Sequence, residues 1–128
     1  MEPSSEERIL AGFSHLMIIF FWYGTATAFA IWLVKRDKSE FIKQSVKQAV
    51  VYQILALGIV HGVDYLAGPK MTQALSVHNI PLTPHILGML SVLIVSGIFL
   101  YGVFGAAANF RGKKFKYALI GNLVDKYL

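Results

Sequence analysis

The stretch ILAGFSHLMIIFFWYGTATAFAIWLV, residues 9–34, decides the fold class of this sequence. It contains no Asp, Glu, Lys or Arg. Because a helix needs about 20 apolar residues to cross the hydrocarbon core of a bilayer, this stretch predicts a transmembrane helix. Gly24 and Thr25 within it leave a second path open, in which the first part of the stretch lies in the interface or re-enters the membrane.

The composition of the whole chain agrees with a membrane protein. Of the 128 residues, 55% are hydrophobic and only 15% are charged, and the mean hydropathy is +0.56. A soluble domain has about 25% charged residues. The chain has no cysteine, which excludes disulfides, thiol catalysis and cysteine-based metal sites. We therefore expect one membrane domain over residues 1–128.

Two further stretches have the length and apolar character of spans. Residues 86–110 carry no formal charge, and residues 45–66 have a charge-free centre. Lys43 and Lys47 can extend their side chains to the headgroups and so lengthen the second span. The sequence thus predicts an all-α integral membrane protein with three transmembrane helices, over about 9–34, 45–66 and 86–110.

The distribution of Lys and Arg predicts an orientation. Basic residues gather in two segments, 35–47 and 111–126, and basic segments stay in the cytoplasm. Three crossings place both segments on that side and the N-terminus outside. The apolar positions of residues 112–128 recur at helical spacing, so we expect an amphipathic interfacial tail. The predicted location is the cytoplasmic membrane of a prokaryote.

The histidines are the first candidates for a site. With three crossings, all four lie toward the outer side of the membrane, at positions 15, 61, 78 and 85. One hypothesis is that His15 and His61 are axial ligands of a b-type haem, because imidazole suits iron. The other is that they are interfacial histidines bonded to water and headgroups. Asp64 shares a helix face with His61, and we expect this pair to be exposed.

Polar and small residues mark helix faces on the second and third spans. The polar stripe of the second span consists of Gln44, Gln48, Tyr52 and Gln53. This stripe favours contact with another helix, and a polar pore lining is the alternative. Close helix packing is expected at Gly58, Gly62, Gly102 and Gly105. Contact with anionic lipid headgroups is expected at Lys113, Lys114 and Lys116.

The order of several short motifs resembles a known family. The motifs are EERILA (6–11), IWLVKRDKSEF (31–41), KQAVVYQI (47–54) and GKKFKYALIGNLV (112–124). In this order they resemble the small prokaryotic membrane proteins related to the protein-import component of the chloroplast inner envelope. The resemblance implies a helical membrane protein and assigns no chemistry.

The sequence lacks the residue patterns of the common hydrolases. It has no HExxH motif, no paired acids and no Ser-His-Asp arrangement. We therefore expect a non-enzymatic membrane protein, an oligomeric or accessory subunit in membrane transport or assembly. Its expected partners are membrane lipids and either further copies of itself or a larger membrane complex, without nucleic acid. The alternative is a haem- or quinone-binding anchor subunit of a respiratory complex.

Overall fold

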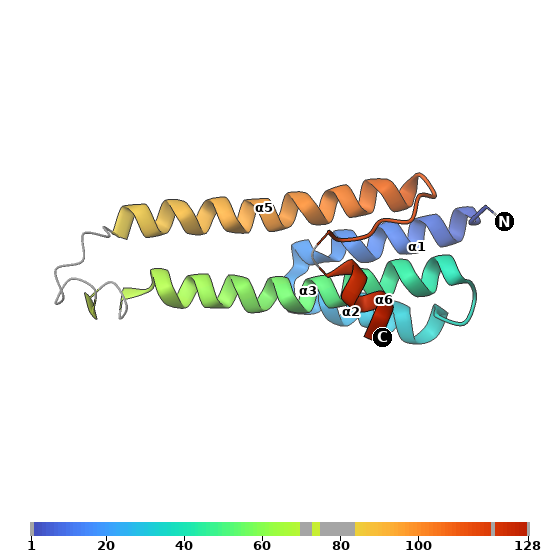
Figure 1. Cartoon of the computed structure of the whole chain (residues 1–128), viewed down its shortest axis with the longest axis horizontal. Coiled ribbons are helices and arrows are strands. Elements are labelled where there is room, and N and C mark those ends of the chain that lie inside the picture. Colours follow the sequence, from blue (N-terminus) through green and yellow to red (C-terminus); the bar gives the residue numbers. More distant parts are fainter. Residues whose placement is uncertain (1, 70–72, 75–83, 119, 128) are drawn as a thin grey trace.

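The computed structural model describes residues 2–69, 73–74, 84–118 and 120–127 of the chain (Figure 1). Of the four histidines named above, His78 lies outside these residues. The principal elements, labelled as in Figure 1, are all helices: α1 (Ser5–Leu16), η1 (Met17–Phe20), α2 (Phe21–Lys35), α3 (Glu40–Ala67), α5 (Pro84–Phe110) and α6 (Gly121–Tyr127).

The three predicted spans are confirmed as helical segments. Ser5–Lys35, Glu40–Ala67 and His85–Phe110 are each long and apolar enough to cross a membrane. The first begins at Ser5 because Ser4 caps it: the Ser4 hydroxyl accepts from the Glu7 backbone, and the Glu7 carboxylate accepts from the Ser4 N–H. The chain is therefore an all-helical multi-pass membrane protein.

The first segment does not follow a straight path. It folds back on itself, so that α1 and α2 run in opposite directions beside α3 (Figure 1). The Lys35 ammonium at the end of α2 lies 3.1 Å from the Glu6 carboxylate at the start of α1. The two ends of this segment therefore lie at the same end of the molecule, as in the re-entrant path that the sequence left open.

The reversal occurs where α1 passes through the short helix η1 into α2. Phe21 has a φ of 50°, which is uncommon for a residue other than glycine. Three residues on, a Cβ at Gly24 would overlap the backbone carbonyl of Met17. Glycine at position 24 therefore allows the backbone of α2 to approach the backbone of η1 closely at the reversal.

The reversal divides the molecule into two parts. At the four-helix end, α1 packs against α3 and α5, and α2 packs against α3; this part includes Val60 and Ile98, which lie beside Phe21. Beyond Val60 and Ile98 only α3 and α5 continue, and we call this part the two-helix end (Figure 1). No described side chain in 61–67 or 85–97 is buried. The core of the protein thus lies entirely at the four-helix end.

The tail follows α5 back along the four-helix end (Figure 1). It is helical only over α6, and it buries Tyr117 and Val124 against the bundle, at 1% and 2% exposure. Leu123, which belongs to the predicted apolar face, is 56% exposed. The amphipathic tail is therefore anchored to the bundle through two side chains.

Candidate functional site

The predicted site residue His15 is buried at the end of α1, inside the helix bundle. Its side chain is 1% exposed, and its Nδ1 forms a 2.8 Å hydrogen bond with the Tyr117 hydroxyl from the tail. The expected position rested on a straight first span. Because the chain reverses at Phe21, His15 lies instead among the helices of the four-helix end.

Small residues on α5 make room for this contact. A Cβ at Gly105 would lie 2.9 Å from His15 Nδ1 and 3.1 Å from the Tyr117 hydroxyl. At Gly102 it would lie 3.0 Å from the side chain of Ile18. The two glycines of the third span therefore sit at close helix contacts, and Gly105 admits the His15–Tyr117 pair.

Two further tyrosines, Tyr52 and Tyr101, pack around Tyr117. The rings of Tyr52 and Tyr117 stack with their centroids 3.9 Å apart, and Tyr101 meets both edge-on. The Tyr52 hydroxyl donates to the Ile98 carbonyl at 2.7 Å, and the Tyr101 hydroxyl accepts from the Ala118 N–H at 2.8 Å. Burial raises the pKa of Tyr117, so its hydroxyl stays protonated. Each of the three hydroxyls thus has a partner.

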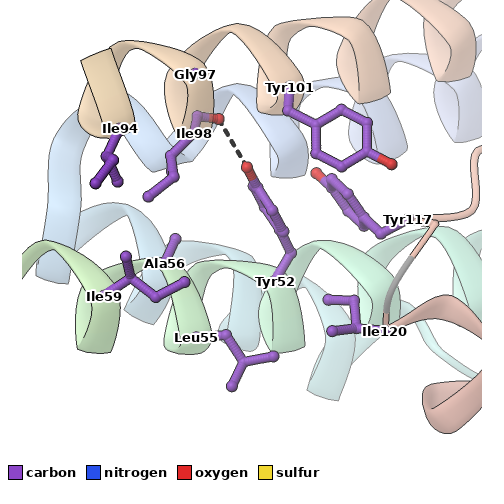
Figure 2. Close-up of a pocket in the computed structure, with 10 residues that line it drawn as sticks. All are labelled: Tyr52, Leu55, Ala56, Ile59, Ile94, Gly97, Ile98, Tyr101, Tyr117 and Ile120. Carbon is purple, nitrogen blue, oxygen red and sulfur yellow. Dashed lines mark hydrogen bonds between the residues drawn. The ribbon is translucent and has the colours of Figure 1, made fainter. Parts of the chain in front are cut away.

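The same tyrosines form one wall of an apolar pocket between α3 and α5 (Figure 2). The pocket has a volume of about 390 Å³. Aliphatic side chains form the rest of its lining, and Figure 2 labels them: Leu55, Ala56, Ile59, Ile94, Ile98 and Ile120. Because the tyrosine hydroxyls already have partners, the pocket offers mainly carbon surface and suits an apolar group.

The polar stripe of α3 lies against other parts of the chain. Gln53 Nε2 donates to the Ser14 carbonyl at 2.6 Å, and Gln48 Nε2 donates to the Gly121 carbonyl at 3.1 Å. Gln44, one turn earlier, is half-buried. The stripe therefore joins α3 to α1 and to the tail.

Several buried polar atoms at this end have no hydrogen-bond partner among the described residues. They are His15 Nε2, Ser45 Oγ, Gln48 Oε1, Gln53 Oε1 and Asn109 Oδ1. Such a concentration is unusual within a membrane-spanning bundle, since each unpaired group costs free energy. We call these residues the polar core of the four-helix end, and they are the chemically distinctive part of the molecule. The tail contributes Tyr117 to this core through its hydrogen bond with His15.

The other predicted histidine, His61, has different neighbours. It is exposed on α3, stacks on Trp22 and accepts a 3.2 Å hydrogen bond from the Trp22 indole N–H. Asp64 and His85 are exposed as well. The structure therefore does not bring His15 and His61 together as a ligand pair. Among the described residues, no group of three His, Asp or Glu side chains is placed to hold a metal ion.

The other predicted residues are two glycines of α3 and three lysines of the tail. A Cβ at Gly58 or Gly62 would meet nothing within 4 Å, so these two glycines make no close contact with another helix in the part of the chain that the structure describes. Lys113 and Lys114 are exposed. Lys116 instead pairs with Asp125 at 2.7 Å, and this hydrogen bond holds the pKa of the Asp125 carboxyl below its usual value.

These features define a small helical membrane protein with a buried polar core and an apolar pocket. The chain belongs to the MamF/MmsF family, described as the magnetosome magnetite crystal formation protein family, whose sequence profile matches residues 6–124. No curated protein and no solved structure matches the chain.

The family match corrects the resemblance drawn from the sequence motifs. The assignment to relatives of the chloroplast import component is wrong, because the matching profile is that of the magnetosome family. Three of the motifs used for it are a helix start, a basic turn and a basic tail, and the fourth, KQAVVYQI, lies inside α3. Such features follow from the requirements of helix capping and membrane orientation, which unrelated small membrane proteins share.

Proposed function

We propose that this chain is a non-enzymatic protein of the magnetosome membrane that takes part in magnetite crystal formation. The observation that carries the proposal is the family match, which spans residues 6–124. The site supports a structural role, because its tyrosine hydroxyls and glutamine amides are engaged in holding helices and tail together.

Deletion of the gene in a magnetite-forming bacterium tests this role. Electron microscopy should show altered crystal size or shape, and the intact gene supplied in trans should restore the parental crystals. A Tyr117→Ala variant, which lacks the side chain that closes the polar core, should restore them only in part. Unchanged crystals in the deletion strain would contradict the proposed function.

We further propose that copies of the chain associate through the two-helix end. Large apolar side chains there are exposed, among them Met89, Val92 and Leu93 at 66–68%. Gly62 and Gly88 lie open on the same helices. Small residues let transmembrane helices approach closely, so these positions suit contact between copies.

Cysteine crosslinking in membranes tests the association, because the chain has no cysteine of its own. Gly62→Cys or Gly88→Cys should form disulfide-linked dimers on mild oxidation. Phe29→Cys, at an exposed position of the four-helix end, serves as the matched control and should stay monomeric. Equal crosslinking at positions 29 and 62 would count against a specific contact.

The folded-back first segment also supports an orientation. Every Lys and Arg that the structure describes lies at the four-helix end, in the first turns of α1, in 35–47 or in 111–126. Basic segments stay in the cytoplasm, so we place this end there. Both termini are then cytoplasmic, whereas a straight first span puts the N-terminus outside.

Reporter fusions distinguish the two orientations. A fluorescent protein that matures only in the cytoplasm should be bright at either terminus and dark when inserted between α3 and α5. A dark N-terminal fusion with a bright C-terminal fusion would support the straight span with three crossings.

A further inference from the structure

A groove runs between α2 and α3 at the four-helix end. Two adjoining cavities form it, of about 200 and 340 Å³, and they share Phe29 and Val50 in their walls. We call it the α2–α3 groove. Its remaining lining residues are Trp32, Lys47 and Val51 in the first cavity, and Trp22, Thr25, Ala26 and Ile54 in the second.

The groove has one cationic end. Lys47 lines the first cavity, and the Arg36 guanidinium lies 5.1 Å from the centre of the Trp32 ring in the same wall. The Trp32 indole N–H has no acceptor among the described residues. An anion at this end would therefore meet the Lys47 ammonium beside Trp32, whose ring carries the Arg36 guanidinium.

Nearby acids leave most of this positive charge uncompensated. Asp37 reaches Arg36 only at 3.9 Å. Asp125 is the acid whose charge interacts with Lys47, and it already forms a 2.7 Å ion pair with Lys116. The cationic end is thus available to a further negative group.

Away from Lys47 the groove becomes apolar. Thr25, the one other polar lining residue, donates its hydroxyl to the Phe21 carbonyl and so presents its methyl group. From Lys47 to Ile54 the groove follows seven residues of helix, or about 10 Å. A cationic end followed by an apolar channel of this length matches a lipid phosphate and the first part of its acyl chain.

We propose that the α2–α3 groove binds one molecule of anionic phospholipid, with its phosphate at Lys47 and Arg36 and one acyl chain along Phe29, Val50 and Ile54. The site differs from the exposed Lys113 and Lys114, which attract anionic headgroups without an adjoining groove. It is also separate from the pocket between α3 and α5.

Tryptophan fluorescence reports on this groove directly, because the only two tryptophans of the chain, Trp22 and Trp32, both line it. Bromine atoms on an acyl chain quench a tryptophan that the chain contacts. The full-length protein is placed in bilayers of phosphatidylcholine that contain brominated phosphatidylglycerol or, separately, brominated phosphatidylcholine. The ratio of quenching gives the preference for the anionic lipid.

The wild-type protein should prefer phosphatidylglycerol several-fold. Lys47→Gln should lower the preference about five-fold, the ratio that corresponds to about 1 kcal/mol for one cation near the membrane surface. Arg36→Gln should also lower the preference, so the conclusion does not depend on the correct folding of Lys47→Gln alone. Lys113→Gln, a basic residue at the same end but outside the groove, is the matched control and should keep the wild-type preference.

A second variant tests the channel rather than the charge. Ala26→Leu should fill part of the groove and reduce quenching by both lipids while leaving their ratio unchanged. Equal quenching of the wild type by both lipids would overturn the proposal. So would an equal loss of preference in Lys113→Gln and Lys47→Gln, since that result indicates general attraction to the basic surface.

Discussion

The two ends of the molecule contrast sharply, although α3 and α5 run through both. At the four-helix end the helices bury His15, Gln48, Gln53 and Asn109, each 2% exposed or less. At the two-helix end the glycines at 62 and 88 lie open, and no described side chain in 85–97 is buried. The difference arises from the reversal at Phe21, which supplies two extra helices to one end only. Close packing is therefore concentrated at the four-helix end, which is also where buried polar side chains need hydrogen-bond partners.

The largest effect should come from a change at the reversal itself. Gly24→Leu places a side chain where the Met17 carbonyl lies. We expect loss of folded protein, because the new side chain overlaps backbone atoms rather than the flexible end of another side chain. The measurement is the yield of monodisperse protein in detergent. Gly58→Leu, where a Cβ would meet no described atom within 4 Å, is the control and should leave this yield unchanged.

The next effect concerns the tail residue that closes the polar core. Tyr117→Ala removes a buried aromatic ring and should lower the free energy of unfolding by about 3–5 kcal/mol. Tyr117→Phe keeps the ring but leaves His15 Nδ1 without its partner, which should cost about 1–3 kcal/mol. Thermal unfolding in detergent ranks the three proteins. If Tyr117→Phe is as stable as the wild type, the hydrogen bond does not contribute to the core.

The two ends also differ in how far the sequence predicts them. The three apolar segments and the start of the first helix near Ser5 are evident from charge-free length and from the acids in the first turn. The sequence does not decide between the reversal and a straight span, because the residues from 17 to 24 are as apolar as a straight span requires. The signal for the reversal was Gly24, but a single glycine also occurs in straight helices.

The site was the least predictable part. The sequence singled out His15, Gln48, Tyr52, Gln53 and Gly105, which all lie at the polar core or beside it. It could not reveal that Tyr117 enters this core, because Tyr117 belongs to a polar, basic tail. The contact depends on the path of the chain after Phe110, which helical periodicity does not encode. The small residues at 102 and 105 on α5 gave the only hint of an incoming side chain.

A smaller effect is expected from the ion pair inside the tail that joins α6 to the segment before it. Lys116 lowers the pKa of Asp125 in the folded protein. The stabilisation is therefore fully present above the unfolded pKa of about 3.9 and is lost as the pH falls through the folded pKa. Because the pair is largely exposed, it should contribute no more than about 1 kcal/mol. Melting temperatures from pH 7 down to pH 2 should show a small acid-dependent loss that Asp125→Asn abolishes.

The smallest effect should come from His61, at the border of the two-helix end. His61 is exposed and contacts only one described side chain through a hydrogen bond, the 3.2 Å bond from Trp22. His61→Ala removes this bond and the ring stacking, yet it leaves no buried group unpaired, because the Trp22 side chain is itself 62% exposed. We expect the melting temperature in detergent to fall by no more than a few degrees. His15→Ala, at the four-helix end, is the matched histidine change and should cost several times more. If the two variants are equally destabilised, or if His61→Ala prevents assembly, His61 belongs to a site that one copy of the chain does not complete.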